Sequence, residues 1–136
     1  MIRHAKILTL IIIGAFSTVA HADTSPETVA GATTVNSATA KQMFDDGALF
    51  IDVRKQLDWD AGRIPDALHL DIKSAFTKDA VIAEAGIDAP IVIYCNGHSC
   101  MRSSQASAMA VDWGFKSVSY YRDGFPAWKK AGYPVE

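Results

Sequence analysis

Short, nearly continuous apolar runs recur along the chain and are separated by longer mixed segments. The clearest runs are residues 48–53 ("ALFIDV"), 90–95 ("PIVIYC") and 117–121 ("SVSYY"). Apolar runs of this length are typical of strands that are buried on both faces, as in a parallel sheet. A weaker run at 68–72 ("LHLDI") predicts a further short strand.

The segments between these runs have the spacing of helices. Residues 102–114 repeat small and apolar side chains at i, i+3, i+4 and i+7 and stop at a glycine. Residues 37–47 begin at Ser37, a suitable N-cap, and also stop at a glycine. Weaker helical patterns cover 77–86 and 126–132. Strands alternating with helices predict one α/β domain, with a mostly parallel central sheet flanked by helices.

The N-terminal segment has a different character from the rest of the chain. A basic start, an apolar core at 7–16 and small residues before a cut after Ala22 follow the pattern of a secretory signal peptide. The apolar core is much shorter than the roughly 20 residues that span a bilayer. The predicted divisions are a signal peptide at 1–22, a flexible polar leader at 23–36 and a folded domain at 37–136.

Export and charge together narrow the range of partners. The signal holds Arg3 and Lys6 of the 13 Lys and Arg residues and none of the 15 Asp and Glu residues, so the exported chain has a net charge of −4. No basic block remains, which argues against a nucleic-acid partner. We expect a periplasmic or otherwise exported protein without stable membrane association after signal cleavage. The absence of a long apolar surface stripe favours a monomer.

Both cysteines lie where the most apolar predicted strand meets a predicted helix. Cys95 ends that strand, and Cys100 and Arg102 follow closely. Ligands of open α/β sheets bind at the carboxyl ends of the strands. Loop N–H groups and a helix N-terminus attract anions there, and Arg102 and His98 add charge at the rim. This setting favours the thiolate form of Cys95, which is the nucleophile.

Other interpretations of the two thiols stay open at this point. Most free cysteines are small buried hydrophobes. Only four residues separate Cys95 from Cys100, so a purely structural disulfide would remove little chain entropy. Beyond the thiols, the exported chain offers only His69 and His98 for a four-ligand zinc site, and we therefore expect no metal.

Four motifs, in order along the chain, resemble the rhodanese, or sulfurtransferase, family. They are "FIDVR" at 50–54, "WDAGRIPDALHLD" at 59–71, "IVIYC" with its loop and "RSSQA" at 91–106, and "YYRDGFPAWKKAGYPV" at 120–135. The resemblance spans about Ser37 to Val135. A short exported chain of this kind is similar to the single-domain periplasmic rhodaneses. The implied architecture is a single rhodanese-like domain.

The resemblance also implies an activity and a set of site residues. In the family a loop cysteine takes a sulfane sulfur from a small anionic donor such as thiosulfate, holds it as a persulfide and passes it to cyanide or a thiol, with no metal or organic cofactor. The nucleophile of the family falls on Cys95, which we prefer to Cys100 because it ends a strand. The residues expected to bind substrate are Asn96, Gly97, His98, Ser99, Met101 and Arg102.

The cysteine loop departs from the family pattern in its length. Six residues, 96–101, separate Cys95 from Arg102, two more than is usual in the family and one more than in related phosphatases. Cys100, inside the loop, is a candidate to resolve an oxidised Cys95 as a disulfide. The alternative function is therefore a thiol–disulfide redox or sulfur-carrier module that uses both cysteines. A phosphatase would need a general acid, for which Asp123 is the nearby candidate.

Charged and ring-bearing residues outside the loop are expected to be structural. Asp52 and Arg54 follow a buried strand, and paired charges at strand ends usually form an ion pair or hydrogen bonds that hold nearby loops. His69 alternates with leucines, which favours a half-buried histidine with satisfied hydrogen bonds. Arg122 is expected to be a surface charge near the site.

Overall fold

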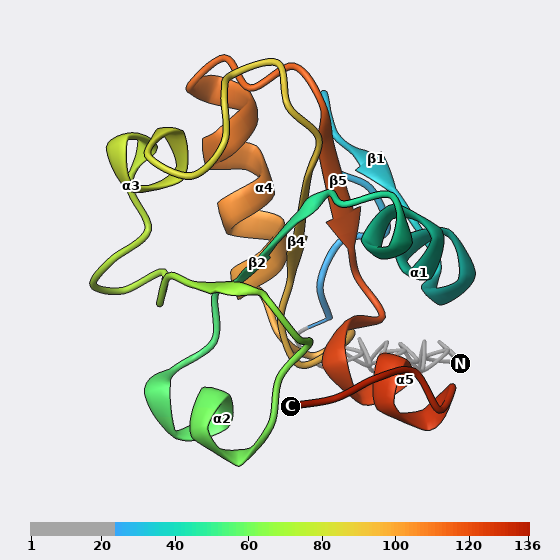
Figure 1. The fold of residues 1–136 in the computed structure, drawn as a ribbon. Coiled ribbons are helices and arrows are strands. Elements are labelled where there is room, and N and C mark those ends of the chain that lie inside the picture. Colours follow the sequence, from blue (N-terminus) through green and yellow to red (C-terminus); the bar gives the residue numbers. More distant parts are fainter. Residues whose placement is uncertain (1–23) are drawn as a thin grey trace, which may run out of the picture.

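The computed structural model describes residues 24–136, and the predicted signal peptide at 1–22 lies outside this range. Strands and helices alternate along the described chain (Figure 1). The strands are β1 (Thr33–Thr34), β2 (Leu49–Asp52), β3 (Leu68–His69), β4 (Ile91–Tyr94) and β5 (Val118–Tyr121). The helices are α1 (Ser37–Asp45), α2 (Gln56–Ala61), α3 (Lys78–Ile82), α4 (Arg102–Asp112) and α5 (Gly124–Lys130).

The strands form one parallel sheet in the order β1-β5-β4-β2-β3. β4 is central: Ile91 pairs with Val118 of β5 on one side and with Leu49 of β2 on the other. All four residues of β4 are buried, which explains why its sequence is apolar without alternation. The predicted α/β fold with a mostly parallel sheet is confirmed.

Helices cover both faces of the sheet (Figure 1). Successive side chains of a strand point to opposite faces, so neighbouring residues of β4 enter different cores. Ile93 packs in the core beneath α3 and α4, together with Val81 and Ala110. Val92 packs in the core beneath α1 and α5, together with Trp128. In residues 24–136 no helix has the length and apolar character needed to cross a membrane.

The start of α1 differs by one residue from the sequence prediction. Asn36, not Ser37, is the N-cap: its backbone is extended, and its Oδ1 accepts a hydrogen bond of 2.9 Å from the Thr39 N–H. The Ser37 hydroxyl instead lies 2.7 Å from the Tyr121 hydroxyl of β5. Both Asn and Ser are good caps, so the local sequence alone does not discriminate between them.

The segment predicted to be a flexible leader packs against the domain from Ser25 onwards. Thr33 and Thr34 form the edge strand β1 beside β5. The Tyr120 hydroxyl donates a 2.8 Å hydrogen bond to the Pro26 carbonyl. Gly31 lies so close to α4 that an added Cβ would sit 2.6 Å from Val111. The folded domain thus begins before residue 37, because small polar residues supply sheet pairing and backbone hydrogen bonds without an apolar pattern.

Candidate active site

Cys95 lies at the carboxyl end of the central strand, as the sequence predicts. It directly follows β4, is fully buried, and begins a loop that ends at α4. The backbone turns at Gly97, whose φ of 101° belongs to the left-handed region that glycine adopts readily. The Cys100 N–H donates to the Gly97 carbonyl at 3.0 Å and closes this turn. Cys95 and Cys100 are joined as a disulfide, with their Cα atoms 6.4 Å apart.

Ser103 makes the polar contacts nearest to the Cys95 sulfur. Its backbone N–H donates to Cys95 Sγ at 3.4 Å, and its hydroxyl oxygen lies 3.2 Å from the same sulfur. Ser103 is in the first turn of α4, where unpaired N–H groups give the helix end a partial positive charge. The family resemblance places its loop-closing arginine and the small residue after it on Arg102 and Ser103, but Ser103 was not among the residues expected to bind substrate. Its position after the loop-closing arginine was the available signal.

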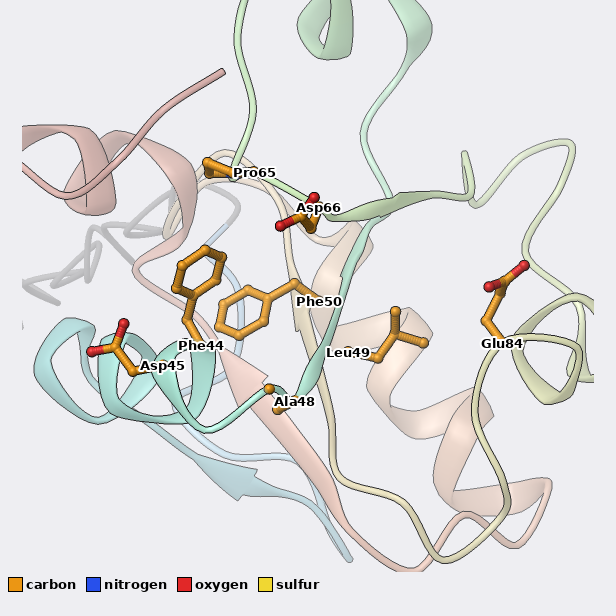
Figure 2. Close-up of a pocket in the computed structure, with 9 residues that line it drawn as sticks. Phe44, Asp45, Ala48, Leu49, Phe50, Pro65, Asp66 and Glu84 are labelled. Atoms are coloured by element: carbon orange, nitrogen blue, oxygen red, sulfur yellow. The ribbon is translucent and has the colours of Figure 1, made fainter.

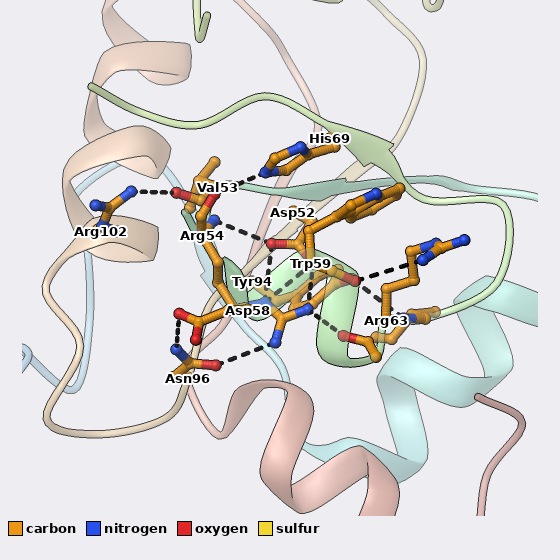
Figure 3. A network of polar contacts seen from close by, with 12 residues as sticks. Asp52, Val53, Arg54, Asp58, Trp59, Arg63, His69, Tyr94, Asn96 and Arg102 are labelled. Carbon is orange, nitrogen blue, oxygen red and sulfur yellow. Dashed lines mark hydrogen bonds and ion pairs between the residues drawn. The ribbon is translucent and has the colours of Figure 1, made fainter. Parts of the chain in front are cut away.

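The Arg102 side chain is paired with a carbonyl and a carboxylate. One of its Nη atoms donates to the Val53 carbonyl at 3.1 Å, so the guanidinium joins the start of α4 to the end of β2 (Figure 3). The same atom donates to Asp71 Oδ1 at 2.7 Å. The Lys73 backbone N–H and the Arg102 side chain lower the pKa of Asp71 against the opposing effect of burial. In this state Arg102 anchors the loop, and its charge is already paired with a carboxylate.

A buried ion pair holds the other end of the loop (Figure 3). Arg54 Nη2 lies 2.6 Å from Asp52 Oδ2, and both side chains are almost completely buried. Arg54 Nη1 donates to Asn96 Oδ1 at 3.2 Å, and Asn96 Nδ2 donates to Asp58 Oδ2 of α2 at 2.8 Å. The structural role predicted for Asp52 and Arg54 is confirmed. Asn96, predicted to bind substrate, here links the loop to both Arg54 and α2.

Two further contacts fix the Arg54 side chain and its neighbours. Arg54 Nη2 also donates to the Gly62 carbonyl at 2.7 Å, and the guanidinium lies 4.6 Å from the Phe125 ring centroid. Burial by itself lowers the pKa of Arg54, but the hydrogen bond and charge of Asp52 outweigh it and raise that pKa. His69 is half-buried and satisfied, as expected, with its Nε2 2.8 Å from the Arg54 carbonyl oxygen.

A second polar group surrounds His98 at the exposed side of the loop. His98 Nε2 lies 2.6 Å from Asp123 Oδ1, and Arg122 Nη1 lies 3.4 Å from His98 Nδ1. The Ser25 N–H donates to the His98 carbonyl at 2.7 Å, and Arg122 Nη2 donates to the Ser25 carbonyl at 2.7 Å. The segment before β1 is therefore part of the site, which its sequence did not indicate. Arg122 is half-buried and bound to this segment rather than a free surface charge.

The remaining loop residues lie at the surface. Ser99 and Met101 are exposed, and Met101 directly precedes α4. Gly124, the first residue of α5, has a φ of 67°, and a Cβ added there would overlap the Cys95 carbonyl oxygen. The Phe125 N–H donates to that same carbonyl at 2.9 Å. Among residues 24–136 no three His, Cys, Asp or Glu side chains are grouped so that they could hold a metal ion.

A separate hollow lies elsewhere on the described part of the molecule. It has a volume of about 580 Å³ and is lined by residues near the start of β2 and before β3, among them Leu49, Pro65 and Asp66 (Figure 2). Parallel strands bring their carboxyl ends to one edge, so this hollow lies toward the edge opposite Cys95. We assign the candidate site by its chemistry, because the hollow contains no thiol.

Fold and site together define a class of protein: a single parallel α/β domain with a cysteine between its central strand and a helix N-terminus. Residues 36–131 match the family described as the rhodanese-like domain. The chain belongs to the rhodanese family.

Relatives and solved structures agree with this membership. The chain is 37% identical over 98 residues to a protein named thiosulfate sulfurtransferase GlpE from Pseudomonas savastanoi pv. phaseolicola, covering 71% of this chain and 86% of that protein. The crystal structure of the Alr3790 protein from Anabaena sp. is similar with a TM-score of 0.65 and 26% identity, covering 75% of this chain and 90% of that one. The human single-domain sulfurtransferase TSTD1 shares the fold, with a TM-score of 0.62 at 22% identity over 73% and 96% of the chains.

Proposed function

We propose that this protein is an exported thiosulfate sulfurtransferase that works through a persulfide on Cys95. The observation that carries the proposal is the position of Cys95 Sγ: buried at the carboxyl end of β4, with the Ser103 N–H directed at it from the first turn of α4. Relatives that carry the name thiosulfate sulfurtransferase support the same activity.

The chemistry needs the reduced form of the loop, because a disulfide sulfur is not a nucleophile. The Cys95 thiolate attacks the outer sulfur of thiosulfate, the sulfur–sulfur bond of the donor breaks, and sulfite leaves with the electron pair. The Ser103 N–H and the α4 N-terminus favour negative charge at the cysteine sulfur. Cyanide or a thiol then takes the outer sulfur and regenerates the Cys95 thiolate.

Export is part of the proposal and is supported by the signal pattern of residues 1–22. Cleavage after Ala22 would leave a chain whose packed structure begins almost at once, since Ser25 is already buried against the cysteine loop. We propose that the processed protein acts as a monomer in the periplasm or an equivalent space. Fractionation of cells that produce the full chain, with N-terminal sequencing of the product, tests the cut, and light scattering tests the oligomeric state.

Intact mass before and after thiosulfate tests the persulfide directly. Processed Cys100→Ser protein, in which Cys95 is the only thiol, is reduced, freed of reductant and incubated with thiosulfate, and one added sulfur atom is expected on the peptide that contains Cys95. In this background Cys95→Ser should abolish the adduct, whereas Gln105→Ala, an exposed change on α4, should keep it. An adduct that persists in Cys95→Ser would refute the assignment of the nucleophile.

A second candidate function is supported by the Cys95–Cys100 bond itself. As a thiol–disulfide redox module, the protein would exchange this bond reversibly with dithiols. Structural disulfides in exported proteins typically have potentials below about −300 mV, and a redox-active pair should lie well above that value. Equilibration of the protein in dithiol buffers of known potential, followed by thiol counting, measures it. A pair that stays fully reduced at oxidising periplasmic poise would exclude this function.

A further inference from the structure

Cys100 is placed where its sulfur can react with a persulfide on Cys95. The two sulfurs are bonded to each other, and the Cys100 carbonyl oxygen also lies 3.5 Å from Cys95 Sγ. The turn that delivers Cys100 is fixed by its N–H donating to the Gly97 carbonyl at 3.0 Å. Cys95 is fully buried, whereas Cys100 is half-buried. An external thiol therefore meets Cys100 before Cys95.

We propose that Cys100 is the enzyme's own sulfur-releasing thiol, so that the protein reduces thiosulfate to sulfite and hydrosulfide at the expense of an external dithiol. This inference rests on the proposed persulfide at Cys95 and names the step that follows it. The bond in the structure shows that Cys100 reaches the inner sulfur, Cys95 Sγ, which is the atom that must be attacked to expel hydrosulfide.

The reaction balances in three steps. First, the Cys95 thiolate takes the outer sulfur of thiosulfate, and sulfite leaves. Second, the Cys100 thiol loses its proton and attacks Cys95 Sγ: the Cys95–Cys100 bond forms, the persulfide bond breaks, and hydrosulfide leaves with the electron pair and that proton. Third, a dithiol reduces the Cys95–Cys100 bond and is itself oxidised to a disulfide. One thiosulfate and one dithiol thus give one sulfite, one hydrosulfide, one disulfide and one proton.

Physical chemistry favours the internal step over an external acceptor. A thiol held in the same short loop reacts at a high effective concentration, while a free thiol must first diffuse to a buried sulfur. The group that leaves Cys95 Sγ in this step is hydrosulfide. It is a weaker base than the alkyl thiolate that leaves in ordinary thiol–disulfide exchange, and weaker bases leave faster. The ring that forms is the one seen in the structure, so the product needs no rearrangement of the loop.

The same geometry assigns the roles of the two sulfurs during reduction. An incoming dithiol attacks Cys100 Sγ, the more accessible sulfur, and Cys95 is the leaving group. The departing Cys95 thiolate is met by the Ser103 N–H at 3.4 Å and by the Ser103 hydroxyl, whose oxygen lies at 3.2 Å. Because these contacts stabilise the Cys95 thiolate, it is a good leaving group, and the exchange is faster than it would be without them. Its release also restores the nucleophile for the next turnover.

A single-turnover experiment tests the inference. Processed protein is reduced, freed of reductant and mixed with one equivalent of thiosulfate, and hydrosulfide, sulfite and intact mass are followed together. The wild type should release one hydrosulfide per chain and end as the disulfide without added sulfur. Cys100→Ser should release sulfite but no hydrosulfide and should retain one sulfur on Cys95. Gln105→Ala should behave as the wild type.

The alternative outcomes separate the two proposals. If the wild type takes up sulfur and keeps it as a stable persulfide, or if the sulfur is found on Cys100, the internal release step is wrong while the sulfurtransferase proposal stands. If neither the wild type nor Cys100→Ser takes up sulfur, the proposed function fails and this inference fails with it. In steady state with about 1 mM dithiothreitol, Cys100→Ser should lower hydrosulfide release about tenfold or more.

Discussion

Replacement of Arg54 by methionine should destabilise the protein strongly and loosen the cysteine loop. The side chains of Arg54 and Asp52 are 3% and 0% exposed. Arg54 Nε and Nη2 donate hydrogen bonds to Asp52 Oδ2 at 3.1 Å and 2.6 Å. Arg54→Met keeps the length of the side chain but leaves the Asp52 carboxylate buried without its partner. Breaking one side of a buried ion pair typically costs about 3–5 kcal/mol. A domain of this size has a total stability of about 5–15 kcal/mol, so the loss is a large part of it.

Urea unfolding followed by tryptophan fluorescence measures this loss in reduced protein. Lys41→Met is the matched control, because Lys41 forms an ion pair of 2.7 Å with Asp45 on the exposed surface of α1. Such helical surface pairs contribute only about 0.3–0.5 kcal/mol. If Arg54→Met lowers the free energy of unfolding no more than Lys41→Met does, the reasoning from burial is wrong. The double variant Asp52→Asn with Arg54→Met should recover part of the loss, since no unpaired charge remains.

Three further predictions test the loop and its supports. Gly124→Ala should slow sulfur uptake from thiosulfate in the mass assay, because its Cβ would overlap the carbonyl of the loop's first cysteine; unchanged kinetics would contradict this. Tyr120→Phe removes the hydrogen bond to Pro26 and should lower the unfolding free energy by about 0.5–1.5 kcal/mol, with faster hydrogen exchange before β1 as the specific readout. The pKa of Asp71 is lowered in the folded state, so its contribution to stability is full above the unfolded value near 4 and is lost as pH falls further. The stability difference between wild type and Asp71→Asn should therefore be constant from pH 6 to 8 and shrink below about pH 4 in urea titrations, and Arg102→Gln should reduce that difference.

Local sequence patterns determined the central strands of this protein and the place of Cys95. The apolar runs at 48–53, 90–95 and 117–121 became β2, β4 and β5, because strands buried on both faces must be apolar throughout. The position of Cys95 followed from the same pattern, since a loop after a central parallel strand lies at the ligand-binding edge. The family motifs likewise indicated the rhodanese family, which the comparisons confirm.

Tertiary structure decided which residues meet at the site. The charge of Arg102 is paired with Asp71, and Asn96 is held by Arg54 and Asp58. These partners come from segments that the order of strands places together, and no local periodicity encodes that order.

The packed segment before β1 shows most clearly that local sequence does not predict contacts between distant segments. Its residues are small and polar, so no hydrophobic pattern distinguished it from a flexible leader. Pairing of β1 with β5 brings the preceding residues along the domain, where Ser25 donates to His98 of the cysteine loop and accepts from Arg122. The energy of such contacts lies in backbone hydrogen bonds to distant partners. The sequence of side chains determines where strands and helices form. Only the folded chain determines which of the remaining backbone N–H and C=O groups form hydrogen bonds with each other.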